Sequence, residues 1–420
     1  MAREKGFSNL NKQISIQKHR KLRIYDEKRA AKYFITNNYF NVINGFESLI
    51  LDNANENKIY SKRKNITDFY RVHQLDKKIS EQLFLQIANI ETELKTKIAY
   101  YFCEKYCQSG IVDNLKYQEI CCYSIPNSSN GKPKYTNYFY KTRINRRTNT
   151  SEIDSNKTHK LFSKHAAYIT TNQVDFLGSI SQNRDKSNIY YLKGHFLGTI
   201  KGIKTNEFKG TLTIDINQNQ RLSLTTGIGC QVHLSNIKGN LQSLSYSDFC
   251  KIKYPYISSY KKPPFGVIIN TLMLNDLIVL FHGLDNDIQN KIVSEIGDFN
   301  INQSGKEEFI CALEILIELR NVTAHYGLVT RYRTSSNLNI ASTLIGRLYL
   351  TPKTRDKVLR FFDIIKVLSL FHSFSNVKIC RRIICYINVN RLHLKSDINF
   401  NFYNRIGAKK VSPWLTILKS

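Results

Sequence analysis

The sequence predicts a mainly α-helical protein with a small antiparallel β insertion in the middle of the chain. Long segments toward both ends repeat apolar residues every three to four positions, as amphipathic helices do. Residues 189–247 instead alternate apolar and polar residues between glycines, which is typical of strands. At 420 residues, the chain is long enough for about two to three domains.

The composition points to a polyanionic partner. The formal net charge is +29, from 62 Lys and Arg against 33 Asp and Glu, and this favours nucleic acid or an anionic membrane surface. The longest apolar run, residues 265–281, is interrupted by polar residues and is shorter than the roughly 20 residues that span a bilayer. The first residues lack the apolar segment of a secretory signal. We therefore expect a nucleic-acid partner and no membrane.

The cysteines indicate a cytoplasmic protein without a metal site. Their number, nine, is odd and includes no CxxC pair, which favours reduced thiols. Cys103 and Cys107 are one helical turn apart, and Cys121 adjoins Cys122, but neither pair has further ligands at the spacing of a zinc site. We expect no metal and no other cofactor.

The N-terminal part divides into a basic arm, residues 1–25, and a helical region, residues 26–107. In the arm, Lys18 and Arg20 are candidates for contacts with RNA phosphates, although a solvated terminus would have the same composition. The helical region opens with a short helix that begins at the acidic pair Asp26-Glu27 and extends to about residue 37.

The clearest element of this region is a helix over residues 76–107. It has one continuous apolar stripe at helical spacing, so we interpret it as scaffold without chemistry of its own. The stripe consists of Ile79, Leu83, Ile87, Ile90, Leu94, Ile98 and Phe102.

Residues 108–260 are predicted to form an insertion, with a basic and aromatic loop before the β-rich segment. Aromatic rings alternate with cations in this loop. The mixture suits unpaired RNA because rings stack on bases and cations neutralise phosphates, but an ordinary basic loop would look the same. The candidate RNA-binding residues are Lys132, Lys134, Tyr138, Tyr140, Arg143, Arg146 and Arg147.

The β-rich segment contains a predicted hairpin. Leu212 and Ile214 alternate with polar residues before the tetrapeptide NQNQ, and Leu222 and Leu224 alternate with polar residues after it.

The C-terminal region, residues 263–420, is again predicted to be helical. Four helices are expected, over residues 265–281, 285–297, 306–326 and 351–374. The last part is basic, and Arg381 and Arg382 are further candidates for contacts with RNA.

The strongest functional signal is the hexapeptide Arg-Asn-Val-Thr-Ala-His at the end of the third of these helices. Asn321 and His325 are about 40° apart around a helix, whereas Arg320 is roughly 140° from His325. Histidine can move a proton near neutral pH, and arginine can bind phosphate oxygens with two hydrogen bonds. Tyr326 is a weaker candidate for stacking on RNA. The spacing alone also fits a helix-terminal histidine and a solvent-facing arginine.

Longer segments around this motif resemble a known family. The segments NYFNVINGFESLI and LDKKISEQLFLQIANIETELKTKIAYYF, followed much later by ELRNVTAHYG, are similar to the Abi abortive-infection proteins of bacteria, of the AbiD and AbiF type. The resemblance covers roughly residues 26–107 and 263–335. These proteins belong to the HEPN superfamily, together with Cas13-like ribonucleases. Arg320, Asn321 and His325 match the superfamily's hallmark, an arginine and a polar residue before a histidine.

The resemblance implies a HEPN-type helical bundle and a metal-independent endoribonuclease with a toxin-like role in antiphage defence. It assigns catalytic roles to Arg320, Asn321 and His325. Such sites are commonly built from two HEPN units, so a chain with one motif implies a homodimer. Relatives of the AbiF type also imply a small noncoding RNA as a partner. The insertion at residues 108–260 is longer than we expect of the family.

Two other classes of protein remain open on the sequence. The first is a non-catalytic ribonucleoprotein component in which Arg320 and His325 only bind phosphate. The second is a DNA-binding regulator, which the charge supports although no helix-turn-helix is recognisable.

Overall fold

The computed structural model describes residues 8–51, 58–61, 63–123, the strands between residues 139 and 244, residue 162, and residues 245–336, 338, 340–352, 358–408 and 410–419. Between residues 124 and 243, Phe162 is the one residue whose side chain is described. The chain divides into two compact units, residues 1–94 with 293–420 and residues 95–292. The domain boundaries that we placed after residues 25, 107 and 260 remain predictions.

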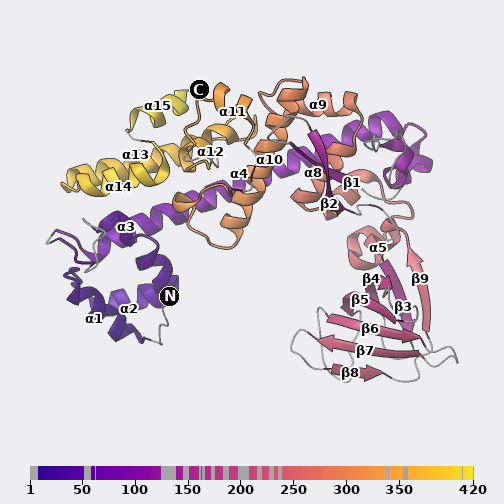
Figure 1. Cartoon of the computed structure of the whole chain (residues 1–420), viewed down its shortest axis with the longest axis horizontal. Coiled ribbons are helices and arrows are strands. Elements are labelled where there is room, and N and C mark those ends of the chain that lie inside the picture. The colour runs from indigo at the N-terminus through magenta and orange to yellow at the C-terminus, as the bar shows by residue number, and fades with distance from the viewer. Residues whose placement is uncertain are drawn as a thin grey trace. The chain divides into compact units, whose positions relative to one another are not determined.

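The described part of the chain is mainly helical (Figure 1). Two helices, α4 (Ile66–Tyr106) and α9 (Asn286–Ile296), belong partly to each unit. The other elements of the first unit are α1 (Leu10–His19), α2 (Glu27–Asn37), the π-helical turn η1 (Phe40–Asn44), α3 (Glu47–Ile50), α10 (Gln303–Ala324), the 3₁₀ turn η5 (Val329–Arg331), α11 (Ser342–Arg347), α12 (Phe361–Leu368), α13 (Val377–Leu392), α14 (Ser396–Ile406) and α15 (Ser412–Lys419).

The second unit combines short helices with strands. Its helical elements are η2 (Gly110–Gln118), η3 (Ile120–Cys122), α5 (Tyr246–Lys253), α6 (Pro255–Ser258), α7 (Phe265–Ile268), η4 (Ile269–Thr271) and α8 (Leu274–Gly283). Strands β1 (Phe139–Ile144) and β2 (Ser151–His159) form an antiparallel pair.

Seven further strands form one antiparallel sheet in the order β8-β7-β6-β5-β4-β3-β9. They are β3 (Ala166–Thr171), β4 (Phe176–Gln182), β5 (Ile189–Phe196), β6 (Phe208–Ile214), β7 (Gln220–Thr226), β8 (Gln231–Leu234) and β9 (Gly239–Leu244). In β6 and β7, Leu212 pairs with Leu222 and Ile214 pairs with Gln220.

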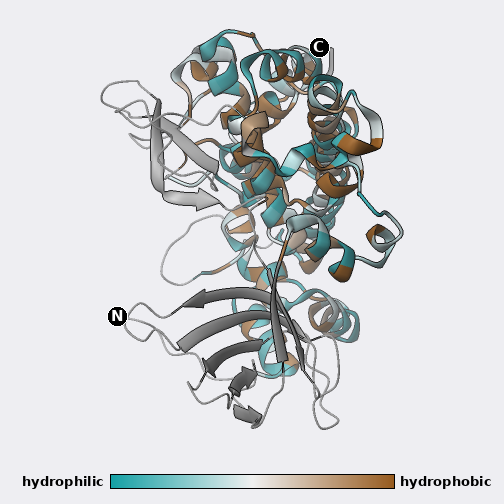
Figure 2. Cartoon of the chain, turned by 90° about the vertical axis from the view of Figure 1, so that its right-hand side faces the viewer, coloured by the Kyte–Doolittle hydropathy of each residue, from teal (hydrophilic) through white to brown (hydrophobic). Residues whose placement is uncertain are grey.

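Helix α4 confirms the apolar stripe that the sequence predicts. Each residue of the stripe is at most 1% exposed, because residues at this spacing share one face of the helix. Apolar and polar residues accordingly alternate along the helices in Figure 2. The helix begins at Ile66 rather than at residue 76, so it contains more turns than the stripe alone predicted.

The N-terminal helices combine a confirmed prediction with a new element. Helix α2 begins as predicted, because the Asp26 carboxylate accepts a hydrogen bond from the Arg29 amide at 2.9 Å and so caps the helix. Within the basic arm, residues 10–19 form helix α1, which buries Ile14 and Gln17. Part of the arm is therefore packed structure.

Two of the predicted C-terminal helices are wrong in extent. The segment 265–281 is not one helix, because the chain becomes extended at Leu272 and Met273, and Asp276 starts a new helix by accepting a hydrogen bond from the Met273 amide at 3.0 Å. In the segment 351–374, helix α12 begins at Phe361 and ends at Leu368, and the described residues directly before it, 358–360, are not helical.

A long-range pairing explains the late start of α12. Arg360 forms an antiparallel bridge with Arg333, and the Thr334 amide donates to the Leu359 carbonyl at 3.2 Å. The Leu359 amide in turn donates to the Thr334 hydroxyl at 2.9 Å. These bonds hold the chain before Phe361 extended, although its apolar spacing fits a helix.

Two ion pairs join the start of α4 to the start of α14, and the first of them is buried on both sides. Lys395 contacts Asp68, and all but a few percent of each residue is buried. Lys64 contacts Asp397 beside them. A buried charge that loses its partner is strongly destabilising, so the Lys395–Asp68 pair fixes the two helix ends against each other.

We expect Asp68→Ala to lower the free energy of unfolding by about 3–5 kcal/mol, because it leaves the Lys395 ammonium buried without its carboxylate. Urea denaturation followed by circular dichroism measures the change. The double variant Asp68→Leu/Lys395→Met should be much closer to the unsubstituted protein. Equal destabilisation of the single and double variants would exclude the ion pair as the cause.

Candidate functional site

The last turn of α10 ends in a left-handed residue that is not glycine. The Gly327 amide donates to the Val322 carbonyl at 2.8 Å and the Tyr326 amide to the Thr323 carbonyl at 3.4 Å, which is the bonding of a Schellman motif. Tyr326 occupies the left-handed position with φ 54°, where an L-residue costs about 1–2 kcal/mol. The chain therefore reverses direction at Tyr326, whose side chain is 82% exposed.

Gly327 follows Tyr326 at a position without room for a side chain. A Cβ atom at this position would lie 2.8 Å from Val322 Cγ1 and 3.0 Å from the Val322 carbonyl oxygen. The chain therefore turns back closely over the last turn of the helix.

The three motif residues are exposed at this helix end. Arg320 and Asn321 lie in the last turns of α10, and His325 is its C-terminal cap residue. Within the described part of the chain, their side chains have no hydrogen bond or ion pair. At 100° per residue, Arg320 lies on the same side of the helix as Ala324, whereas Asn321 and His325 point in another direction.

Glu318, two turns before His325 on α10, does not contact its imidazole. Its carboxylate accepts hydrogen bonds from the Tyr332 hydroxyl at 2.7 Å and from the Ser335 amide at 2.9 Å. Burial is the main cause that raises the pKa of Tyr332, and the hydrogen bond to Glu318 raises it further. Glu318 therefore holds the loop after the motif rather than the imidazole.

The same loop is anchored to α4 by the Asp76 carboxylate. It accepts hydrogen bonds from the Val329 amide at 3.2 Å, the Thr330 amide at 2.8 Å and the Thr330 hydroxyl at 2.5 Å. Asp76 is 3% exposed. Burial raises its pKa to about 6, while these hydrogen bonds and the charge of Arg405 act in the opposite direction.

Arg405 supports the other side of this arrangement. Its guanidinium donates to the Gly45 carbonyl at 3.0 Å and to the Ser48 hydroxyl at 2.7 Å. Burial lowers its pKa to about 10, so it remains charged at neutral pH. Gly45 must lack a side chain, because a Cβ atom would lie 2.3 Å from Leu328 Cδ1. The loop after the motif thus packs directly on the η1 turn.

Three arginines form a cluster directly after the motif, and we name Arg331, Arg333 and Arg360 the arginine cluster. Burial is the main cause that lowers the pKa of Arg333, and the positive charges of Arg360 and Arg331 lower it further. Arg331 and Arg333 are exposed, and their side chains have no acidic partner among the described residues. Uncompensated like charges at one place favour a polyanionic ligand. The segment Arg-Tyr-Arg in the sequence was the signal for this cluster.

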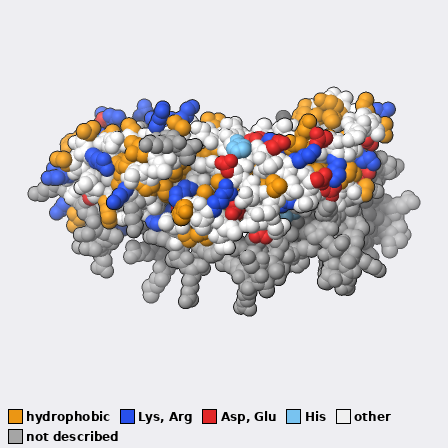
Figure 3. All heavy atoms as spheres, turned by 90° about the horizontal axis from the view of Figure 1, so that it is seen from above, with side chains coloured by type: hydrophobic (Ala, Val, Ile, Leu, Met, Phe, Trp, Pro, Cys, Tyr) orange, Lys and Arg blue, Asp and Glu red, His pale blue; other side chains and the backbone are white. Residues whose placement is uncertain are grey.

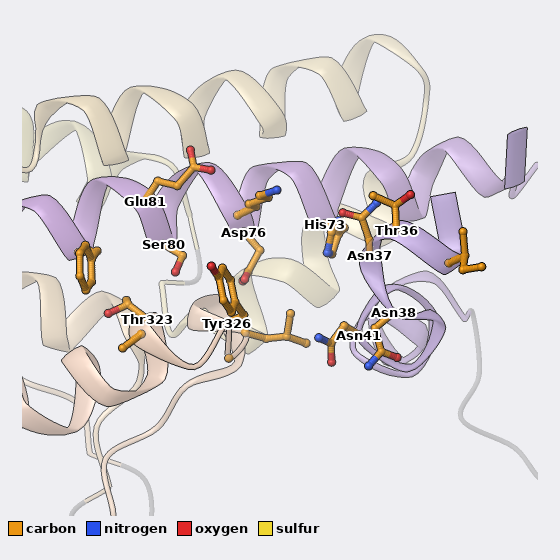
Figure 4. A pocket seen from close by; sticks show the side chains of 16 residues that line it. Thr36, Asn37, Asn38, Asn41, His73, Asp76, Ser80, Glu81, Thr323 and Tyr326 are labelled. Carbon is orange, nitrogen blue, oxygen red and sulfur yellow. The ribbon is translucent and has the colours of Figure 1, made fainter. Parts of the chain in front are cut away.

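A pocket of about 590 Å³ lies between the end of α10, the part of α4 from His73 to Phe84, and the end of α2 with η1 (Figure 4). Thr323, Ala324, Tyr326, Gly327 and Leu328 line it from the motif side. The lining does not include Arg320, Asn321 or His325.

The α4 side of the pocket was missed because we interpreted this helix as scaffold alone. His73, Asp76, Lys77, Ser80 and Glu81 line the pocket. They recur at three- and four-residue spacing as a second stripe beside the core stripe, which is the signal that could have revealed them. His73 is hydrogen-bonded through Nδ1 to the Tyr33 hydroxyl at 2.9 Å. Burial lowers the pKa of His73, and the positive charge of Lys77 lowers it further.

The other candidate RNA-binding residues are dispersed. Lys18 is paired with Glu27, and Arg20 donates to Glu47 at 2.8 Å, so both take part in contacts within the chain. Arg381 and Arg382 lie on α13, and their side chains have no partner in the described part of the chain. On the face shown in Figure 3, Lys and Arg side chains gather toward the left, where Figure 1 has α13 and α14.

The candidates of the middle segment are outside the described side chains. Tyr140 and Arg143 lie on β1, of which the backbone alone is described. Lys132, Lys134, Tyr138, Arg146 and Arg147 lie outside the described residues altogether.

One group of side chains in the second unit has donors suited to a soft metal ion. The ligand atoms of Glu119, Cys121 and Cys122 all lie within 4.8 Å of one another. A structural zinc site takes four ligands, and this group has three. The expectation of no metal stays a prediction.

None of the helices in the described part of the chain combines the length and the apolar character that crossing a membrane requires.

Comparison with protein families matches residues 32–329 to the family described as Abi-like protein. The match begins within α2 and includes α4, the middle segment and the complete motif. Because it covers more than half of the chain, the protein belongs to this family of abortive-infection proteins. Comparisons with curated proteins and with solved structures find no match.

The buried Asp76 carboxylate predicts a defined pH dependence of stability. Its pKa is higher in the folded state, about 6, than the usual 3.8, so the folded state binds more protons between these values. The contribution of Asp76 to the free energy of unfolding should therefore fall by up to about 3 kcal/mol as the pH rises from about 4 to 6. Above pH 6 this contribution should change little.

Urea denaturation of the unsubstituted protein and of Asp76→Asn across this range measures the effect. The difference in stability between the two proteins should shrink as the pH rises. A difference that stays constant from pH 4 to 7 would contradict the raised pKa.

Proposed function

We propose that this protein is a metal-independent endoribonuclease of the HEPN type that acts as a toxin-like effector in abortive infection. One observation carries the proposal. Arg320, Asn321 and His325 are exposed together at the end of α10 and have no partners in the described part of the chain that would assign them a structural role. The net charge of +29 and membership of the Abi-like family support it.

The chemistry follows from the three side chains. RNA carries its own nucleophile, the 2′-hydroxyl, whose oxygen attacks the adjacent phosphorus while the bond to the 5′-oxygen breaks. His325 transfers the proton, either from the 2′-hydroxyl or to the leaving 5′-oxygen. Arg320 binds the phosphate oxygens and stabilises the charge of the transition state. Asn321, one turn before His325, orients the imidazole or the substrate.

The angular separation supports a site built from two chains. Arg320 and His325 point roughly 140° apart, so one helix end does not direct both at the same phosphate. In-line cleavage also needs a base and an acid, and the chain has a single motif histidine. A homodimer that faces two helix ends across one cleft supplies two histidines and two arginines. The resemblance to the HEPN superfamily, whose sites are commonly built from two HEPN units, supports such a shared site.

The ligand of the resting protein, on this proposal, is a small noncoding RNA. The arginine cluster supports RNA binding, because Arg331 and Arg333 place uncompensated positive charge within a few residues of the motif. Phosphates of a bound strand would neutralise these charges and extend to Arg320.

A non-catalytic ribonucleoprotein component is the second candidate function. It is favoured by the lack of any described hydrogen-bond partner that fixes the imidazole of His325, since a catalytic histidine usually has one. In this case Arg320 and His325 would bind phosphate without cleaving RNA.

We expect His325→Ala to reduce RNA cleavage about 10²–10⁴-fold in the presence of a chelator, because the proton-transfer group is removed, while RNA affinity changes little. Gel analysis of a labelled RNA measures cleavage, and filter binding measures affinity. His393 provides a matched control, since it is also an exposed C-terminal cap residue, on α13. His393→Ala should cleave normally.

Equal cleavage by the His325→Ala variant would exclude the catalytic role. Loss of cleavage in chelator would exclude a metal-independent reaction. A protein that light scattering shows to be a fully active monomer would contradict the two-chain site.

We expect Arg331→Gln/Arg333→Gln to weaken RNA binding and to reduce the slope of log affinity against log salt by about 0.7 for each phosphate that the variant no longer neutralises. Filter binding over a series of salt concentrations gives the slope. The variant Arg381→Gln/Arg382→Gln tests the two adjacent arginines of α13 in the same way. An unchanged slope for Arg331→Gln/Arg333→Gln would remove the arginine cluster from the RNA interface.

A further inference from the structure

The pocket beside the motif has the shape and lining of a ligand site rather than of a packing defect. Its volume of about 590 Å³ is within the range of small-ligand sites. It lies wholly in the first unit, and three separate segments line it. Figure 4 shows their side chains converging from α4, from the end of α2 with η1, and from the end of α10.

Large apolar and aromatic side chains at this pocket are left in contact with solvent. Tyr326 is 82% exposed, Ile35 is 73% exposed and Phe84 is 46% exposed. The backbone of Tyr326 is also left-handed, a conformation that costs free energy for a residue with a side chain. Exposed rings at a concave surface favour a flat ligand that stacks on them.

The polar groups of the pocket are mainly amides and hydroxyls. Asn37, Asn38 and Asn41 line its far wall. The Asn38 side-chain oxygen accepts from the Phe40 amide at 3.0 Å, which leaves its NH₂ group for a ligand, and the Asn41 amide has no partner among the described residues. Side-chain amides carry a donor and an acceptor side by side, as the edges of nucleobases do.

The charges of the pocket favour a neutral ligand group over a phosphate. Lys77 is its one cation, and the exposed Glu81 and the buried Asp76 oppose it. Arg320, Arg331 and Arg333, which have no acidic partner among the described residues, do not line the pocket. A nucleic-acid strand could therefore place phosphates on the arginines and a base in the pocket.

We propose that this pocket holds one unstacked nucleobase of a bound RNA strand, which stacks on Tyr326 and is read at its edge by Asn38 and Asn41. The inference rests on the proposed function in one respect, that RNA is the ligand. It assigns the pocket to substrate recognition, whereas the motif performs the chemistry.

The placement of the pocket links recognition to cleavage. Thr323 and Ala324 line it, and Arg320 lies on the same side of α10 as Ala324, one turn earlier. A base that enters the pocket brings its neighbouring phosphate toward Arg320. The pocket thus selects strands whose bases are free to leave a stack, that is, single-stranded or bulged RNA.

The test compares two single strands of about ten nucleotides, an oligouridylate and the same strand with abasic residues, at one salt concentration. Binding is measured by fluorescence anisotropy in the His325→Ala background, which prevents cleavage from altering the result. We expect the strand with bases to bind more tightly than the abasic strand.

Substitutions in the pocket should remove this difference. Tyr326→Ala should weaken binding of the strand with bases about 5–150-fold, because one stacked base contributes about 1–3 kcal/mol, and should leave binding of the abasic strand unchanged. Tyr326→Phe should bind normally, since it keeps the ring. Asn41→Ala should weaken binding of the strand with bases as well.

Tyr349 provides a matched control outside the pocket. It is 84% exposed and also has a left-handed backbone, with φ 48°. Tyr349→Ala should therefore leave binding of both strands unchanged. An equal reduction for Tyr326→Ala and Tyr349→Ala would overturn the proposal, because it would reflect a general effect of removing an exposed ring.

Other outcomes separate this inference from the proposed function. Equal affinity for the two strands, with no effect of Tyr326→Ala, would overturn the base pocket while RNA binding stands. Failure of both strands to bind would overturn RNA as the ligand, and with it both proposals.

Discussion

The candidate site depends on the hydrogen bonds that the buried Asp76 carboxylate accepts from the loop after the motif. They attach Val329 and Thr330 to α4, whose core stripe holds the carboxylate in place. Only a few residues separate these bonds from the end of α10, so the chain must turn sharply between them. The left-handed backbone of Tyr326 makes that turn. The hydrogen bonds of Asp76 therefore constrain the direction in which the motif points. They also constrain the position of the Tyr326 ring and the pocket beside it.

This constraint brings three kinds of chemistry to one short segment. The end of α10 carries the proton-transfer and phosphate-binding groups of the proposed reaction. The arginine cluster, a few residues later, concentrates positive charge, and the pocket beside it is nearly neutral and rich in amides. Separate places for phosphate and for base are what recognition of a single strand requires. Because the phosphates would bind to arginines outside the pocket, the pocket itself need not be strongly basic although the chain is.

Patterns that depend on neighbouring residues were predicted correctly. The core stripe of α4 and the Asp26 cap of α2 follow from helical periodicity and from one side-chain hydrogen bond within a turn. The segment before Phe361 was predicted wrongly, because it pairs with Arg333 and Thr334, and a local pattern contains no information about a distant partner. The pocket was missed for the same reason, since its walls come from three segments and its α4 residues looked like the polar side of a scaffold helix.

By itself, the sequence determined that the protein is basic and mainly helical, that it resembles the abortive-infection family to which it belongs, and that Arg320, Asn321 and His325 stand together at a helix end. These properties depend on composition and on spacing along one helix. Only the tertiary structure decided that Glu318 is held by Tyr332, that Asp76 anchors the following loop, and that Tyr326 stands over a pocket. The two contacts join residues that are distant in the sequence, and the position of the Tyr326 ring depends on a backbone turn. Only the packing of the folded chain determines such arrangements.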